Sequence, residues 1–444
     1  TVLEHTDLRV SVWHNDLVII PGVKLIAALP GYEPAVITSG IDVRKQQAVT
    51  ESEKRYITGR KPGVTRTITI GRAGTFSGKS KARVLGRILD EETGEPMSFV
   101  AVYIAEIKSG TVTDASGFFN LTLTPGSYNI SAEYLGYEKG KYLFEIYSDG
   151  SITLRMNKAA VQLNEVVVSS ERHSGIRAKD PGFDQVSMKS IKTLPVMMGE
   201  RDILKVSTTL PGIVSVGEGS AGLNVRGSSS DQNAFYINRI PIYNTFHLFG
   251  FFPAFNPDII KDLSIYKGFI PAQYGGRLAS VFNITTRQGN RKRFTAHGGI
   301  SPVTANIVLE GPVKKDTSSF LFSARSSYSD WILSRIKDPT ISASSANFND
   351  FSGGMNWDIQ KTQLSLFLYR SYDRFSLSDI NSYDYSNTGA SVIAGHTFSN
   401  SLRGEFAITG SQYDFSTVDM EEISSAYQHA YKMDHMETRA DFRQ

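Results

Sequence analysis

The sequence predicts a mostly β protein of several domains, and three observations carry this prediction. The chain has 444 residues, which allows two to four domains at roughly 100–200 residues each. Its 20 tyrosines and 25 phenylalanines, against 3 tryptophans, lie in many short runs where apolar and polar residues alternate, as in strands. No run reaches the roughly 18 uninterrupted apolar residues of a transmembrane helix, so we expect none.

Composition and motifs give no support for an enzyme. The net charge of +3 provides no overall attraction to nucleic acid. The absence of cysteine excludes a disulfide framework, a thiolate zinc site and a cysteine nucleophile. The eight histidines show no compact metal-ligand spacing. The G-x-G-x-x-G pattern at residues 217–222 lacks the strand and helix of a dinucleotide site. We therefore expect no catalytic residues, no metal and no cofactor.

The first two segments are a hairpin with a linker, and a sandwich. Over residues 1–80, alternation at Leu8, Val10 and Val12 predicts a β-hairpin, and residues 40–80 are polar and basic, as in a linker. Residues 81–157 contain about seven short apolar runs separated by Gly, Pro, Asp and Ser, which predicts a small β-sandwich. We expect part of its core to consist of Phe118, Leu121, Leu123, Tyr128 and Ile130.

Residues 158–175 form a link, and residues 176–290 form a mixed α/β domain. One short helix is expected within residues 200–211, ended by Pro211 and Gly212. Strand-like pieces follow at residues 222–227, 233–244, 262–268 and 279–287. Within the link, Glu165–Val168 is a β-prone strip that could add as a strand to the sheet edge of a partner. The alternative is an ordinary last strand of the sandwich.

Residues 291–444 contain long strands with one apolar and one polar face. Phe320 and Phe322 alternate with Ser323 and Arg325. Leu402, Phe406 and Ile408 likewise alternate with Arg403, Glu405 and Thr409. A membrane β-barrel requires this pattern, but a soluble antiparallel sheet with one solvated face shows it as well. Alternation alone does not separate the two.

An aromatic segment at residues 243–257 also has two interpretations. It contains many aromatic residues together with Gly and Pro, and it is too irregular for a helix. It is either the buried core of a loop or a loop that faces a ligand or a barrel wall.

Several segments together resemble one family. They are GRILDEETGEPMSFVAVYI, TDASGFFNLTLTPGSYNISAEYLGYE, LNEVVVSS, LNVRGSSSDQNAFYINRIPIYN and the run from HLFGFF to TRQGN. Over about residues 82–444 the chain resembles the TonB-dependent outer-membrane receptors, of the Bacteroidetes type with an amino-terminal carboxypeptidase-regulatory-like domain. The opening hairpin resembles the end of a secretin/TonB short amino-terminal signalling domain.

The resemblance implies a plug over residues 176–290 and the first part of a transmembrane antiparallel β-barrel over residues 291–444, with about 22 strands when complete. At roughly 20 residues for each strand and its loop, residues after 293 supply about seven strands. We therefore expect the sequence to be the amino-terminal portion of a longer protein.

The resemblance also implies site residues. It places a TonB box at Leu163, Asn164, Glu165, Val166, Val167 and Val168. It implies that Arg226 and Arg277 pair with acidic residues on the barrel wall. The ligand-binding candidates are Tyr243, Asn244, Phe246, His247 and Phe249. Where the family has an Asp-Gly turn, this chain has Asn238 and Arg239, and we expect a different turn because Arg adopts a positive φ at a higher cost than Gly.

The function implied is import of a ligand across the bacterial outer membrane, and the ligand is a nutrient, a chelate, an oligosaccharide or a peptide. The implied partners are TonB with ExbB and ExbD, outer-membrane lipids and a surface lipoprotein, and no nucleic acid. Two alternatives stay open. One is a ligand-sensing signal transducer that acts on an anti-sigma factor, and the other is a non-transporting subunit of an outer-membrane complex.

Overall fold

The computed structural model describes residues 8–13, 16–21, 66–72, 81–159, 182–187, 202–216, 222–378, 380–400, 402–420 and 426–443. The chain divides into two units, Thr1–Pro62 and Gly63–Gln444. In the first unit, β1 (Leu8–Trp13) and β2 (Asp16–Pro21) pair as an antiparallel hairpin, which confirms the predicted one. Over the described ranges, no helix has the length and apolar character needed to cross a membrane.

The second unit begins with the sandwich, which consists of a three-stranded sheet in the order β10-β4-β7 and a five-stranded sheet in the order β3-β9-β8-β5-β6. Its strands are β3 (Arg66–Ile70), β4 (Ala82–Asp90), β5 (Ala101–Ile104), β6 (Ser109–Val112), β7 (Phe118–Leu123), β8 (Gly126–Glu133), β9 (Gly140–Ile146) and β10 (Gly150–Met156).

Two details of the sandwich differ from the prediction. Strand β3 lies in the predicted linker, but it pairs in parallel with β9 and so belongs to the sandwich. Phe118 is not in the core, because β7 buries Phe119, Leu121 and Leu123 and turns Phe118 the other way. Two neighbouring phenylalanines allow either phase of alternation, and only packing selects one.

The plug is a mixed domain around a five-stranded sheet in the order β11-β18-β19-β14-β15. The side chain of Asp202 accepts hydrogen bonds from the amides of Leu204 and Lys205, which fixes the start of its short helix. Its elements are β11 (Phe183–Ser187), α4 (Ile203–Ser207), β12 (Ile213–Ser215), β13 (Leu223–Val225), η1 (Ser230–Gln232), β14 (Asn233–Ile237), β15 (Ile240–Ile242), β16 (Phe246–His247), η2 (Leu248–Gly250), β17 (Phe252–Pro253), β18 (Ile260–Lys267) and β19 (Ser280–Thr286).

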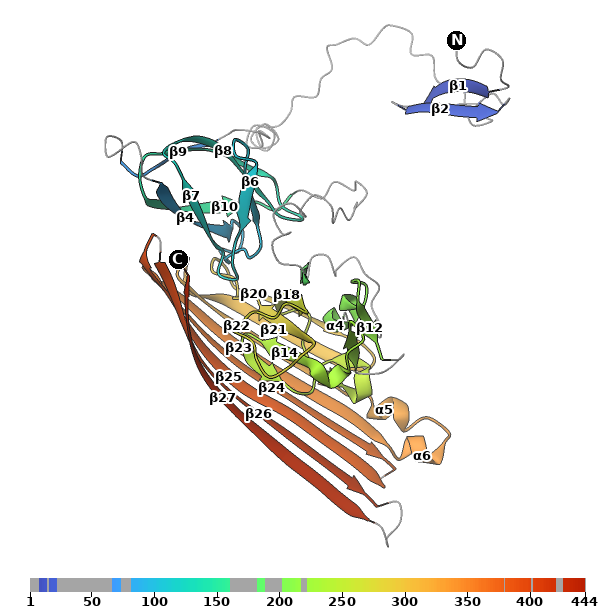
Figure 1. The fold of residues 1–444 in the computed structure, drawn as a ribbon. Helices are drawn as coiled ribbons and strands as arrows, with labels where there is room; N and C mark the ends of the chain where they lie inside the picture. Colours follow the sequence, from blue (N-terminus) through green and yellow to red (C-terminus); the bar gives the residue numbers. More distant parts are fainter. Residues whose placement is uncertain are drawn as a thin grey trace, which may run out of the picture. The chain divides into compact units, whose positions relative to one another are not determined.

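The wall is an eight-stranded sheet in which each strand pairs antiparallel with the next along the chain. Its strands are β20 (Thr295–Ile300), β21 (Thr304–Lys314), β22 (Ser318–Ser327), β23 (Ser345–Ile359), β24 (Thr362–Leu377), β25 (Asn381–Ser399), β26 (Leu402–Asp419) and β27 (Tyr427–Arg443). Helices α5 (Asp330–Leu333) and α6 (Pro339–Ser342) lie between β22 and β23. Figure 1 shows the plug against one face of this sheet.

Plug and wall share one apolar cluster. Plug residues such as Phe246, Phe255 and Phe282 form most of it, and Phe367 and Tyr369 of β24 complete it. Burial of this area stabilises the contact by roughly 25 cal/mol per Å². The plug is therefore in apolar contact with the wall.

Candidate functional site

The two faces of the wall are opposite in character. On β22, Arg325 is 1% exposed and Phe322 is 41% exposed. On β26, Thr409 is 2% exposed and Ile408 is 55% exposed. A soluble sheet would bury the apolar face and solvate the polar one. This wall does the reverse, as a lipid-facing barrel sheet does, which confirms the membrane interpretation of residues 291–444.

A buried charge cluster joins the plug to the polar face of the wall. The imidazole of His247 lies between two carboxylates, 2.5 Å from Asp373 and 2.7 Å from Asp350, and it is fully buried. The guanidinium of Arg325 also pairs with Asp350, with Nε 2.8 Å from the carboxylate, and it donates to the carbonyl of Pro253 in the plug. At the interface, one cation of the plug and one of the wall thus share two carboxylates of the wall.

The cluster favours a charged imidazole. Burial disfavours the imidazolium, but the negative charges of Asp350 and Asp373 outweigh this effect and raise the pKa of His247 to about 9. The ring of Phe348 lies flat against His247 at 4.2 Å and under Arg325 at 5.0 Å. The cluster is therefore paired internally at neutral pH, which is the condition for burying four ionised groups.

A second ionic contact comes from the turn between β14 and β15. Asn238 and Arg239 have φ values of 44° and 71°, which is the positive-φ pair of a type I′ hairpin turn. The expectation of a different turn is therefore wrong. Arg239 accepts the unfavourable backbone conformation while its guanidinium pairs with Glu405 of β26 and, at 3.1 Å, with Asp441 of β27.

The pairing of Arg226 and Arg277 with the wall stays a prediction. Arg226 and Arg277 are both exposed, and no ion pair of either is found among the described residues. Arg239 of the plug pairs with Glu405 and Asp441 of the wall, and Arg325 of the wall donates to the carbonyl of Pro253 in the plug. One signal in the sequence pointed to Arg239, namely a charged residue at a turn position that favours glycine.

The ligand-binding candidates lie in different surroundings. Phe246 and His247 are buried between plug and wall, and their role as ligand contacts stays a prediction. Tyr243 and Asn244 are half-buried, and their backbone amides donate to the side chain of Asn387. The side chain of Phe249 lies outside the described ones.

Two other predictions concern residues that the structure does not describe. The TonB box, Leu163–Val168, lies outside the described residues, and so does most of the glycine pattern at 217–222. Within the described ranges, no group of three or more Asp, Glu or His side chains is arranged to hold a metal ion.

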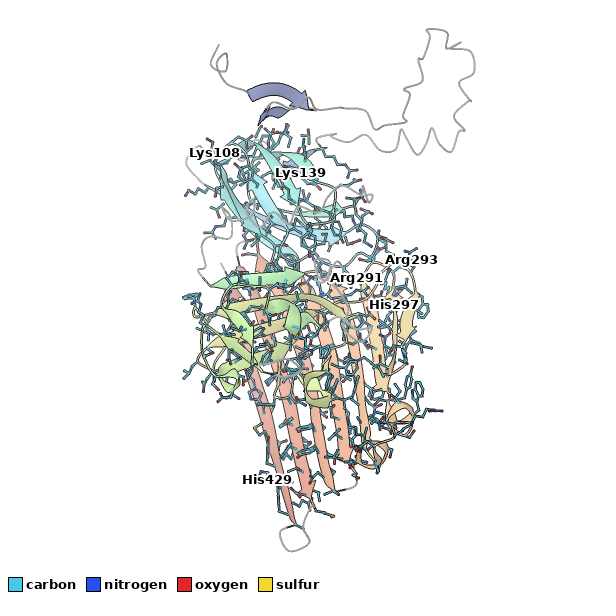
Figure 2. The ribbon with its side chains drawn as sticks, turned by 90° about the vertical axis from the view of Figure 1, so that its right-hand side faces the viewer. Lys108, Lys139, Arg291, Arg293, His297 and His429 are labelled. Carbon is cyan, nitrogen blue, oxygen red and sulfur yellow. The ribbon has the colours of Figure 1, made fainter. Side chains whose placement is uncertain are left out.

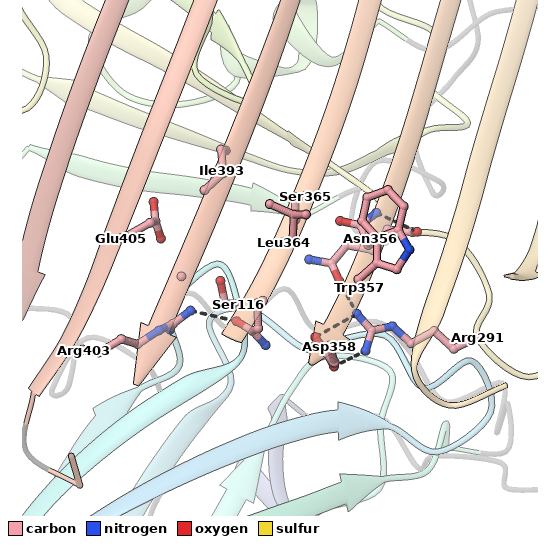
Figure 3. A pocket seen from close by; sticks show the side chains of 13 residues that line it. Ser116, Arg291, Asn356, Trp357, Asp358, Leu364, Ser365, Ile393, Arg403 and Glu405 are labelled. Carbon is pink, nitrogen blue, oxygen red and sulfur yellow. Dashed lines mark hydrogen bonds and ion pairs between the residues drawn. The ribbon is translucent and has the colours of Figure 1, made fainter. Parts of the chain in front are cut away.

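Polar contacts hold the sandwich to the ends of the wall strands and to the plug. Arg87 of β4 pairs with Asp358 at the end of β23. Arg291 pairs with the same carboxylate (Figure 3). Arg403 of β26 pairs with Asp114 at 2.7 Å and lies over the ring of Phe118 at 4.1 Å. In Figure 2, Arg291 and Arg293 lie at this end of the sheet, whereas His429 lies at the opposite end.

Comparisons with known proteins agree with this architecture. A family model described as CarboxypepD_reg-like domain matches residues 84–168, and one described as TonB-dependent Receptor Plug Domain matches residues 174–281. A curated protein, TonB-dependent receptor P39 of Formosa agariphila, is 28% identical over 227 residues, which are 47% of this chain and 20% of that protein.

Solved structures were also compared. The ferric preacinetobactin receptor BauA of Acinetobacter baumannii has 16% identity and a TM-score of 0.44, over 59% of this chain and 44% of its own. The outer membrane transporter YddB of Escherichia coli has 13% identity and a TM-score of 0.40, over 53% and 39%. The chain thus spans a fifth of the curated relative and less than half of each of these solved chains.

The two matched domains precede a sheet that turns its polar face to the plug and its apolar face outward. Together they give the architecture of a plug domain that lies on a wall of strands. The chain carries a carboxypeptidase-regulatory-like domain ahead of a TonB-dependent receptor plug domain, and it is similar to a TonB-dependent receptor. Its location is the bacterial outer membrane.

Proposed function

We propose that the protein imports a ligand across the outer membrane with energy delivered by TonB, together with ExbB and ExbD. The observation that supports this most directly is the plug on the polar face of the wall, held there by His247 and Arg239. Ion pairs and charge-assisted hydrogen bonds fix one position of the plug. A pull on the plug can exchange them for contacts with water.

The direction of transport follows from the two ends of the wall. Strands β21 and β22, and β23 and β24, are joined by the short segments 315–317 and 360–361, at the end where Asp358 meets the sandwich. The opposite end carries the long segment 328–344 between β22 and β23. In outer-membrane barrels the short turns are periplasmic and the long loops extracellular. The ligand therefore enters at the end far from the sandwich.

TonB would grip the chain through the strip Glu165–Val168, beyond the sandwich. A strand added to the sheet edge of a partner is held by main-chain hydrogen bonds, which resist a pull and demand little of the side chains. This strip lies between the sandwich and the plug along the chain. A pull on it is therefore transmitted to both domains.

The test uses the full-length protein in outer-membrane vesicles. Val167→Pro removes an amide donor and prevents strand pairing, so it should weaken capture of the periplasmic domain of TonB by at least about tenfold, or roughly 1.4 kcal/mol. Val167→Ile keeps the strand and is the matched control. Deletion of residues 163–169 should abolish energised uptake and leave ligand binding intact. Equal TonB capture by both variants would contradict the proposal.

A further inference from the structure

One loop of the sandwich binds the segment that joins the plug to the wall. This segment, residues 287–294, lies between the last plug strand, β19, and the first wall strand, β20, and we refer to it as the connector. The carboxylate of Glu95 accepts the backbone amides of Gln288 and Gly289 in the connector at 2.8 and 2.7 Å. We refer to residues 90–96, which include Glu95, as the contact loop.

The backbone of the contact loop also lies against the connector. The carbonyl of Thr93 accepts the amide of Arg291 at 2.8 Å, and the carboxylate of Glu92 pairs with Arg293 at 2.7 Å. At Gly94, whose φ is 74°, a Cβ atom would lie 3.3 Å from the Cβ of Arg291. The contact loop therefore holds the connector at several points.

The sandwich also contacts the plug and the wall directly. Ser98 donates to the carboxylate of Asp262 on β18 at 2.7 Å, and both residues are almost fully buried. The ammonium group of Lys261 donates to the carbonyl of Pro96 at 2.7 Å. Together with the pair between Arg87 and the wall, these contacts join the plug to the wall through the sandwich.

The contact loop further holds the end of the sandwich that leads to the predicted TonB box. The amide of Glu91 donates to the carbonyl of Met156, the last residue of β10, at 2.9 Å. Glu92 pairs with Lys158 through one carboxylate oxygen, and with Arg293 of the connector through the other. A pull on Lys158 therefore acts directly on the loop that holds the connector.

The two chain segments that flank the predicted TonB box, Leu163–Val168, differ in length. Residues 160–162 separate the box from Ala159 of the sandwich, and residues 169–182 separate it from β11 of the plug. An extended chain spans at most about 3.6 Å per residue, so the first segment reaches about 15 Å and the second about 50 Å. The sandwich therefore takes up a pull on the box before the plug does.

The sandwich also closes a space between the plug and the wall. A cavity of about 300 Å³ is lined by residues of the plug and the wall, and by Phe99, Asp114 and Ser116 of the sandwich. Detachment of the sandwich would remove this side of the cavity. It would thus open the space between plug and wall at the end of the wall that carries the short turns.

We propose that the sandwich is a force-released latch on the plug. It joins the plug to the wall until TonB pulls it away, and only then does the pull reach the plug. Its contacts suit this role, because the described ones are ion pairs and hydrogen bonds with no shared apolar cluster, and water can replace such contacts. The proposal rests on the import function and names the step that controls it.

The experiment pulls on the full-length protein in a supported lipid bilayer, with a force-microscope tip that carries the periplasmic domain of TonB. The sequence contains no cysteine. Glu92→Cys with Arg293→Cys therefore places two thiols at an exposed ion pair, and a reducible bis-maleimide links them. With the link closed, force passes from the box through the sandwich to the wall and bypasses the plug. Plug extension should then be lost, and reduction of the link should restore it.

The matched control is Glu133→Cys with Lys139→Cys. These residues also form an exposed ion pair, but both belong to the sandwich, so the same linker does not join two domains. The linked control should extend the plug as often as the intact protein does.

A second variant tests the latch without a linker. Glu95→Ala removes the acceptor of two connector amides, and it should speed release of the sandwich at constant force by about tenfold or more. The force that extends the plug should not change. Glu106→Ala is its control, because Glu106 accepts hydrogen bonds from Asn129 within the sandwich.

Two results would overturn the proposal. One is plug extension in the linked Glu92→Cys, Arg293→Cys protein as often as in its reduced form, and the other is equal release of the sandwich in Glu95→Ala and Glu106→Ala. A streptavidin tip that pulls on a biotinylated peptide inserted after Val168 separates the latch from the import function. If TonB does not capture the protein but this pull still releases the sandwich before the plug, the import function fails and the latch remains.

Discussion

The plug and the sandwich are both tied to the wall by charged side chains, but the surroundings of these charges differ. At the plug, His247, Arg325 and Asp350 are buried beside an apolar cluster that includes Phe367 and Tyr369 of the wall. At the sandwich, the exposure of the paired side chains varies, from 9% and 23% for Arg403 and Asp114 to 64% and 47% for Arg293 and Glu92. The described apolar cluster of the sandwich contains no plug or wall residue.

This difference separates two kinds of attachment. Exposed ion pairs contribute about 0–1 kcal/mol each and weaken with salt. Breaking a buried pair leaves an uncompensated charge, at a cost of about 3–5 kcal/mol. Because the sandwich shares no apolar cluster with the wall and its ion pairs keep a partly exposed carboxylate, we expect it to leave the wall under conditions that keep the plug in place. A pull along the chain would then meet little resistance at the sandwich and most of it at the plug.

The largest effect is expected for Asp350→Asn, which removes the carboxylate shared by His247 and Arg325. This variant tests whether buried charges hold the plug more strongly than exposed ones hold the sandwich. We expect the free energy of unfolding of the plug to fall by about 3–5 kcal/mol, measured as protease sensitivity of the full-length protein in urea. Asp384→Asn is the matched control, because Asp384 pairs with the largely exposed Arg374 and should cost at most about 1 kcal/mol. Equal losses would show that burial does not set the strength of the contact.

The turn at Arg239 combines an ionic contact with an unfavourable backbone conformation, so two substitutions there can separate the two effects on the stability of the plug. Arg239→Ala and Arg239→Gly both remove the pairs with Glu405 and Asp441, so both should destabilise the plug. Glycine also relieves the positive φ, so the Gly variant should be more stable than the Ala variant by about 1 kcal/mol. Urea midpoints of the two variants measure this difference, and a more stable Ala variant would contradict the type I′ turn.

The smallest effect is expected at the sandwich. Arg403→Glu removes the pair with Asp114 and the contact with Phe118, and it should loosen the sandwich by about 1 kcal/mol. Amide hydrogen exchange of residues 114–118 should then become about fivefold faster. Adding Asp114→Arg restores opposite charges and should slow the exchange again. An unchanged rate in the single variant would mean that other contacts hold the sandwich.

Much of the fold was readable from the sequence because alternation is a local property. The two faces of β22 and β26 follow from residues two apart, so Arg325 and Thr409 were placed correctly on the polar face. At Phe118 and Phe119, two neighbouring phenylalanines fit either phase of alternation equally well, and the prediction of which one is buried was wrong. Strand β3 was missed because five residues in a polar segment gave no sign of the partner strand β9.

The charge contacts were less predictable, because they join distant parts of the chain. His247 pairs with residues 103 and 126 positions away, and nothing in the local sequence distinguishes Asp350 or Asp373 from other acids on the polar face. For the same reason the contact of Arg239 with the wall was not predicted.

The sequence by itself determined the order of the domains, the strand content and which residues of each strand face together, since these depend on neighbours along the chain. Only the tertiary structure decided which face is covered by the plug and which charges are buried together. These depend on strand register and on packing between segments more than a hundred residues apart, where a shift of one residue would turn every side chain to the other face.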